Sequence, residues 1–225
     1  MVKDLNIRGK SIYKIVDGPS WTEAEANSNK LGGHLVTIND DEENAFLSVF
    51  NDGSNKWIGL NDLNVEGQWE WSSGEDVTFA AWDTESNQPD DHIDSHNPEG
   101  QDFVSIDWDR GDTNWDDKSD HSIWNLNGIA ETKFIRRGDS GYVLIGYDQW
   151  KDNNSLTTEE VIESANKLGG HLVTINDSEE HSWLVNEFGK RYHHAVLIGY
   201  TVFIESTPFT LWLGGFLIVC ASSFI

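Results

Sequence analysis

Cysteine is nearly absent from this 225-residue chain: Cys220 is the only one, so no disulfide bond can form within the chain. That absence leaves the redox compartment open, because an extracellular protein need not contain disulfides. The first six residues also lack the apolar segment that a signal peptide requires. The chain is therefore cytoplasmic, exported by another route, or a piece of a longer protein.

Positive charge is scarce as well, with 15 lysine and arginine residues against 39 aspartate and glutamate residues and a formal net charge of −24. This balance argues against nucleic acid and anionic membrane surfaces as partners and makes cations the natural counter-species. Thirteen of the acidic residues fall between Asp83 and Asp120, where only Arg110 and Lys118 oppose them. Eleven tryptophans are typical of a folded chain rather than a disordered acidic one, so the acidic cluster favours a metal site.

The acidic stretch contains Gln88-Pro89-Asp90, in which a proline separates two oxygen-bearing side chains. Asp91 follows at once, and Asp116 and Asp117 come directly after Trp115. These side chains offer only hard oxygen donors, and Ca²⁺ takes about six to eight such ligands in an irregular geometry that a loop can supply. A cis peptide bond before the proline would turn both neighbouring side chains to the same side. The other interpretation is a solvated acidic turn with an incidental proline.

A segment of twelve residues occurs twice without change, at 29–40 and at 166–177, and Glu42-Glu43 is matched by Glu179-Glu180. Such identity indicates two related modules, with a boundary near residues 136–139. Each copy begins with the pattern strand, helix, strand, helix.

The second copy has no counterpart of the long polar stretch 74–100, and its last twenty residues carry no charge. Residues 209–225 are strongly apolar but barely long enough to span a bilayer. Three interpretations remain open: a truncated or misread second domain, a C-terminal membrane anchor, or core strands.

Two helices are predicted in the first copy from their end signals. Ser20 and Glu23 have the spacing of a capping box, and Gly32-Gly33 ends that helix. Asp40 is expected to cap the second helix, and one face of it is predicted to carry Phe46, Val49 and Phe50. Apolar runs predict strands at 34–38, 57–60, 69–71, 103–106 and 128–130.

The order of these features resembles a C-type lectin-like domain: a helix, Trp-Ile-Gly-Leu at 57–60, a long loop, Gln-Pro-Asp at 88–90 and Trp-Asp-Asp at 115–117. The resemblance covers about residues 11–134, and the repeat restarts it at residue 140. It implies an α+β fold with two helices flanking small antiparallel sheets and a long calcium-binding loop. We therefore predict a complete domain over residues 1–138 and a truncated second copy, ending in an apolar tail, over residues 139–225.

In that family the long loop holds up to two Ca²⁺ ions, and a sugar places two neighbouring hydroxyl groups directly on one of them. The resemblance implies that the sugar-facing calcium is bound by Gln88, Asp90, Gln101, Asp116 and Asp117. Glu99 is an alternative ligand to Gln101. The resemblance further implies an accessory calcium bound by Asp62, Glu66, Asp91 and Asp102.

Two positions depart from the family pattern, which usually has glutamate at 101 and asparagine at 116. Asp116 removes a hydrogen-bond donor, because an ionised carboxylate only accepts. Gln-Pro-Asp implies galactose-type sugars, with Gln88, Asp90 and Asp116 as sugar contacts. Galactose selectivity usually also needs an aromatic ring against the apolar face of the sugar. Trp108 is the best candidate for that ring, and the other interpretation of Trp108 is an exposed tryptophan in a turn.

The sequence thus predicts a calcium-dependent, carbohydrate-binding lectin domain rather than an enzyme. The alternative is a calcium-binding domain that recognises a protein or an ice surface. Sites of this kind fill at extracellular calcium concentrations, so an extracellular or cell-surface location is expected. A zinc site built from His92, His96 and His121 is disfavoured, because their spacing fits no helical pair of ligands. Without disulfides, bound calcium is expected to stabilise the fold.

Overall fold

The computed structural model describes residues 6–93, 98, 100–108, 113–145, 156–189, 196–197 and 216–222. The chain forms two compact units. The first, here called the N-terminal unit, comprises residues 13–28 and 33–132, and the C-terminal unit comprises residues 1–12, 29–32 and 133–225. The assignment of residues 1–138 and 139–225 to two copies of one domain stays a prediction.

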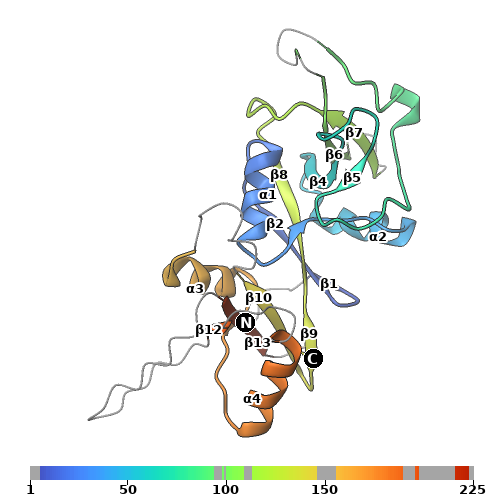
Figure 1. The fold of residues 1–225 in the computed structure, drawn as a ribbon. Helices are drawn as coiled ribbons and strands as arrows, with labels where there is room; N and C mark the ends of the chain where they lie inside the picture. The colour runs from blue at the N-terminus through green and yellow to red at the C-terminus, as the bar shows by residue number, and fades with distance from the viewer. Residues whose placement is uncertain are drawn as a thin grey trace. The chain divides into compact units, whose positions relative to one another are not determined.

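The N-terminal unit is built mainly on a sheet with strands in the order β2-β8-β4-β6-β7, to which β3 and β5 add short pairings with β8 and β4. Its strands are β2 (Ser11–Val16), β3 (His34–Leu35), β4 (Lys56–Asn61), β5 (Glu70–Trp71), β6 (Phe103–Asp107), β7 (Asn114–Lys118) and β8 (Asn127–Lys133). Its helices are α1 (Trp21–Asn29) and α2 (Asp41–Phe46), with short 3₁₀ turns η1 (Leu47–Phe50) and η2 (Thr84–Ser86). Helices α1 and α2 lie on opposite sides of β8 and β4 (Figure 1), which confirms the predicted α+β class with two flanking helices.

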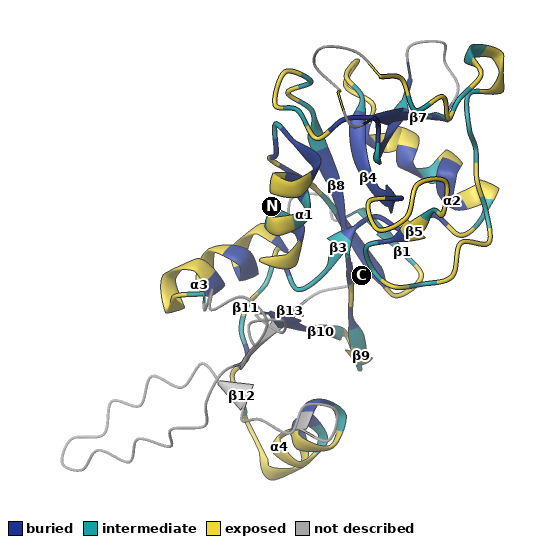
Figure 2. Ribbon diagram, turned by 45° about the horizontal axis from the view of Figure 1, so that its top comes forward, coloured by how far each residue is buried: buried dark blue, intermediate teal, exposed yellow. Residues whose placement is uncertain are grey.

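The core of this unit lies between the sheet and α2, where strands β4 and β8 are largely buried (Figure 2) and β6 is buried as well. Trp115 is fully buried and makes edge contacts with the rings of Trp71, Phe79 and Trp82, at centroid distances of 5.8, 5.7 and 6.0 Å. Large aromatic side chains bury extensive apolar area, so this packing supplies stability that the chain does not obtain from disulfides.

The second helix differs from its prediction at the C-terminal end. Asp40 caps it as expected, accepting a hydrogen bond from the Glu43 amide. After Phe46 the chain tightens into η1, in which residues three apart lie on the same face. Leu47 and Phe50 therefore face the core, whereas Val49 is 52% exposed, so the predicted apolar face was wrong in that residue.

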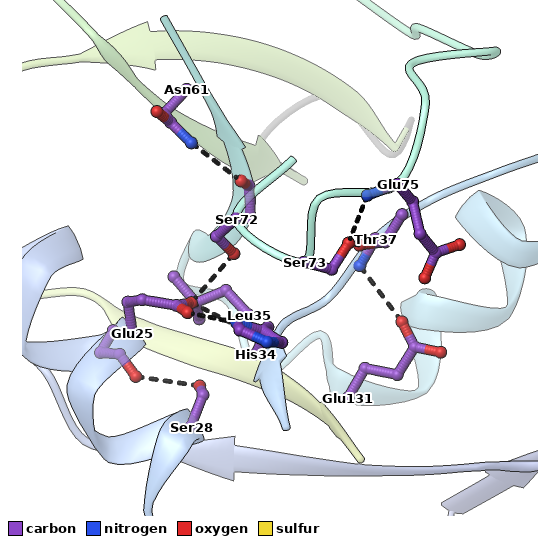
Figure 3. A network of polar contacts seen from close by, with 12 residues as sticks. Glu25, Ser28, His34, Leu35, Thr37, Asn61, Ser72, Ser73, Glu75 and Glu131 are labelled. Atoms are coloured by element: carbon purple, nitrogen blue, oxygen red, sulfur yellow. Dashed lines mark hydrogen bonds and ion pairs between the residues drawn. The ribbon is translucent and has the colours of Figure 1, made fainter. Parts of the chain in front are cut away.

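A polar network ties α1 to the strands beside it (Figure 3). The Glu25 carboxylate accepts hydrogen bonds from the Leu35 amide at 2.8 Å and from the Ser72 hydroxyl at 3.1 Å, and its other oxygen lies 2.8 Å from His34 Nδ1. Strand β3 is shorter than predicted, ending at Leu35. The network fixes α1 relative to β3 and to the chain after β5.

The C-terminal unit carries a sheet in the order β11-β13-β10-β9, with β12 paired to β13. Its elements are β1 (Asn6–Arg8), β9 (Ile135–Arg137), β10 (Ser140–Ile145), α3 (Thr158–Lys167), β11 (His171–Leu172), α4 (Ser178–Leu184), a π-helix η3 (Val185–Gly189), β12 (Val196–Leu197) and β13 (Phe216–Ser222). Residues 216–222 of the apolar tail are thus a strand paired with β10, and the rest of the tail lies outside the described residues. Within the described part of the chain, no helix has the length and apolar character needed to cross a membrane.

The repeated segments adopt the same local structure. Asp177 caps α4 as Asp40 caps α2, and Tyr142 donates to Glu180 at 3.0 Å as Tyr13 donates to Glu43 at 2.6 Å. The two related parts of the chain therefore share a buried tyrosine–carboxylate hydrogen bond as well as a helix cap. Whether the second segment is a second copy of the whole domain stays a prediction.

Candidate metal site

Three carboxylate groups gather at one end of β4 and β6. Oxygen atoms of Asp62, Glu66 and Asp102 lie within 4.8 Å of one another, and these residues are among the four expected to bind an accessory ion. Asp62 directly follows β4 and Asp102 directly precedes β6, and the antiparallel pairing of these strands brings the two together. The Asp62 amide donates to the Asp102 carbonyl at 3.0 Å, which holds the turn carrying Glu66 in place.

Asp62 is the buried member of this group, with 1% of its surface exposed. Its Oδ2 accepts a hydrogen bond from the Gly67 amide at 2.8 Å, while its buried Oδ1 has no hydrogen-bond partner in the structure. Burial, assisted by the charges of Glu66 and Asp102, raises the pKa of Asp62 to about 6 against the opposing hydrogen bond from Gly67. An unsatisfied carboxylate oxygen among further carboxylates fits a cation such as Ca²⁺.

The loop with Gln88-Pro89-Asp90 is anchored to β7 by Asp117. This fully buried carboxylate accepts the backbone amide of Asp90 on Oδ1 at 3.2 Å and that of Asp91 on Oδ2 at 2.8 Å. Burial raises the pKa of Asp117 against these hydrogen bonds. The Gln88–Pro89 peptide bond is cis.

Gln88 offers the second unsatisfied oxygen of the region, because its Oε1 is buried and has no hydrogen-bond partner in the structure. Asp90 next to it is exposed. Gln101 already has hydrogen-bond partners, since its side-chain Oε1 accepts from the His92 backbone amide at 2.8 Å and its backbone amide donates to Asp91 Oδ1 at 2.9 Å. Asp91 therefore binds the loop backbone and is not one of the three clustered carboxylates.

Asp116, expected as a ligand and as a sugar contact, contacts a basic residue of its own strand. Its Oδ2 forms an ion pair with Lys118 Nζ, and Lys118 also lies 3.6 Å from Asp107 Oδ2. The sequence identified Lys118 only as one of two basic residues in an acidic stretch. Asp116 is its neighbour on the same face of β7, whereas the approach of Asp107 depends on the pairing of β6 with β7, which the local sequence does not specify.

Trp108 corrects both sequence interpretations. It is 6% exposed and belongs to the core, with Lys56 Nζ 5.5 Å from its ring centroid, so it is neither an exposed turn residue nor an open surface for a sugar. Glu99 and His96 lie outside the described residues. The one group of three or more potential metal ligands that the described residues form contains carboxylates without histidine.

Comparison with known families and proteins identifies similar sequences for the N-terminal unit. Residues 17–123 match the family model described as Lectin C-type domain. Lectin BRA-3 of Megabalanus rosa is 36% identical over 117 residues, which are 51% of this chain and 66% of that protein. The Type-2 ice-structuring protein of Hemitripterus americanus is 39% identical over 82 residues, 36% of this chain and 48% of that protein. The chain thus spans less than two thirds of the length of each of these curated relatives.

Among solved structures, the cow C-type carbohydrate-recognition domain of CD23 is similar to this chain at 23% sequence identity, with a TM-score of 0.47. The similarity covers 57% of this chain and 92% of that domain.

Proposed function

Because residues 17–123 are a C-type lectin domain, a type of domain that binds without catalysis, we propose that this chain binds carbohydrate through loop-bound calcium and favours galactose-type sugars. Two buried oxygen atoms carry the proposal: Gln88 Oε1 and Asp62 Oδ1 have no hydrogen-bond partners in the structure. A buried acceptor without a partner costs about 1–3 kcal/mol, and a bound cation removes that cost. Each oxygen lies in a segment with several other oxygen-bearing side chains, and Ca²⁺ prefers oxygen ligands.

The proposed sugar-facing ion is held by Gln88, Asp90 and Asp117, with Gln101 beside them. A second ion is held by Asp62, Glu66 and Asp102. Bound calcium supplies direct coordination for two neighbouring sugar hydroxyls. Gln88 and Asp90 orient those hydroxyls, because the amide donates a hydrogen bond on one side and the carboxylate accepts one on the other.

The second candidate is recognition of a protein or ice surface by the same calcium-bound loops. Two apolar side chains on these loops favour it, since Leu63 is 60% exposed and Ile93 is 62% exposed. The similarity to an ice-structuring protein is a further reason to test it.

Retention on immobilised galactose and mannose, with calcium and with a chelator, tests the proposal. We expect calcium-dependent retention on galactose that free galactose competes away. Gln88→Ala should abolish retention, whereas Glu42→Gln, which removes an exposed carboxylate on α2, should not change it. Calcium uptake without sugar retention would support the protein or ice alternative.

We also propose an extracellular or cell-surface location. Calcium-binding modules of this kind commonly have Kd values of about 10⁻⁴–10⁻³ M, and cytosolic calcium would leave them empty. Two further relatives, an immunoglobulin epsilon Fc receptor and a mannose receptor, are receptors by name.

A further inference from the structure

Neighbouring residues of β7 point to opposite faces of the sheet. Asp117 is fully buried and reaches the loop backbone at Asp90 and Asp91. Asp116 lies directly opposite Ser105 of β6 and shares its face with Lys118. The two adjacent aspartates therefore have different surroundings, although the sequence suggests a single pair of ligands.

Lys118 is the centre of the group on the Asp116 face. Its side chain is 6% exposed and forms an ion pair with Asp116 Oδ2. Its Nζ lies 3.6 Å from Asp107 Oδ2 and 5.2 Å from the ring centroid of Trp124. The other carboxylate oxygen of Asp107 accepts a hydrogen bond from Ser105 at 2.7 Å. The buried ammonium group is thus neutralised by Asp116 in direct contact and by Asp107 at a longer distance.

We propose that Lys118 determines the sugar specificity of the site by holding Asp116 as its counter-ion, away from calcium and from the sugar. The inference rests on the proposed function. A buried charge that loses one partner destabilises the protein strongly. If Asp116 turned away to bind calcium, the buried Lys118 would lose its direct counter-ion and the protein would lose stability. Hydroxyl orientation is then left to Gln88 and Asp90, the donor and acceptor pair on which the proposed preference for galactose-type sugars rests.

The ion pair is tested first without calcium or sugar. Melting temperatures of the full chain in a chelator are compared for the wild type, Asp116→Asn, Lys118→Met and the double variant. We expect each single variant to melt lower and the double variant to melt no lower than the less stable single variant, because the first change already breaks the pair. Additive losses in the double variant would overturn the ion pair.

Calcium titration then separates a counter-ion from a ligand. Asp116→Asn should weaken calcium binding by about threefold or less, whereas Asp90→Asn should weaken it by about tenfold or more. Equal losses would make Asp116 a calcium ligand and overturn the inference. If the wild type binds no calcium or no sugar, the proposed function fails, while the melting experiment still decides the Asp116–Lys118 pair.

The effect on specificity is measured by competition with free galactose and free mannose. The double variant has an amide at 116 with no ammonium group beside it, so the ratio of the two inhibition constants should change by about threefold or more. An unchanged ratio would overturn the specificity role of Lys118.

Discussion

Asp62 illustrates how one buried carboxylate couples protonation, stability and metal binding. Burial raises its pKa from 3.8 to about 6. Between these two pH values the metal-free folded protein therefore keeps the proton on Asp62, whereas the unfolded chain has released it. Asp62 therefore favours the folded state most strongly at low pH. Its contribution is lost as pH rises from about 4 to about 6.

The prediction concerns the metal-free protein and the variant Asp62→Asn. Urea unfolding of the wild type in a chelator should show the contribution of Asp62 to stability falling between pH 4 and pH 6, whereas the neutral amide of the variant should remove that part of the pH dependence. Subtracting the two curves isolates Asp62 from the other carboxylates. Parallel curves over this range would contradict a raised pKa at Asp62.

At the scale of secondary structure, the repeated helix start depends on a buried tyrosine. Glu43 accepts the Tyr13 hydroxyl at 2.6 Å and the Asn39 amide at 3.0 Å, so one carboxylate joins β2 to the start of α2. Glu180 accepts Tyr142 and the Asn176 amide in the same way. The bond therefore belongs to the conformation that both repeated segments adopt.

Removing the hydroxyl should lower stability by a modest and measurable amount. Tyr13→Phe keeps the ring packing and loses one hydrogen bond to a charged group, which predicts a loss of about 1.5–3 kcal/mol in the free energy of unfolding by urea. Tyr142→Phe is the matched change in the second segment. A Tyr13→Phe protein as stable as the wild type would show that the bond adds nothing to this unit.

Local signals in the sequence predicted the elements well and the partners across strands poorly. The Asp40 cap and the strands at β4, β6 and β8 depend on neighbouring residues, so short patterns identify them. The exposure of Val49 depends on where a helix tightens, which apolar spacing does not reveal. The contact of Asp116 with Lys118 depends on β7, which puts residues two apart on one face and which no apolar run in the sequence predicts. The approach of Asp107 to Lys118 and the burial of Trp108 depend on the pairing of β6 with β7 and on core packing, which are long-range properties.

At the scale of the whole molecule, the excess of negative charge and the lack of disulfides make bound cations the expected stabilising agents. A chelator should therefore lower the melting temperature clearly. Calcium at about 100 times its Kd adds about 2.7 kcal/mol, comparable with one disulfide bond. Scanning calorimetry measures the shift in melting temperature. Magnesium should replace calcium poorly, because Mg²⁺ requires a stricter octahedral geometry. A melting temperature indifferent to the chelator would contradict both proposed calcium sites.

The anchoring of the binding loop through backbone groups has a consequence for how such a domain can evolve. Asp117 accepts the amides of Asp90 and Asp91, and every amino acid except proline provides such an amide. Substitution of the side chains at these two positions therefore leaves the attachment of the loop to β7 in place. A lineage carrying this arrangement can change what it recognises by mutating the loop, while selection on stability acts on a single aspartate in the strand.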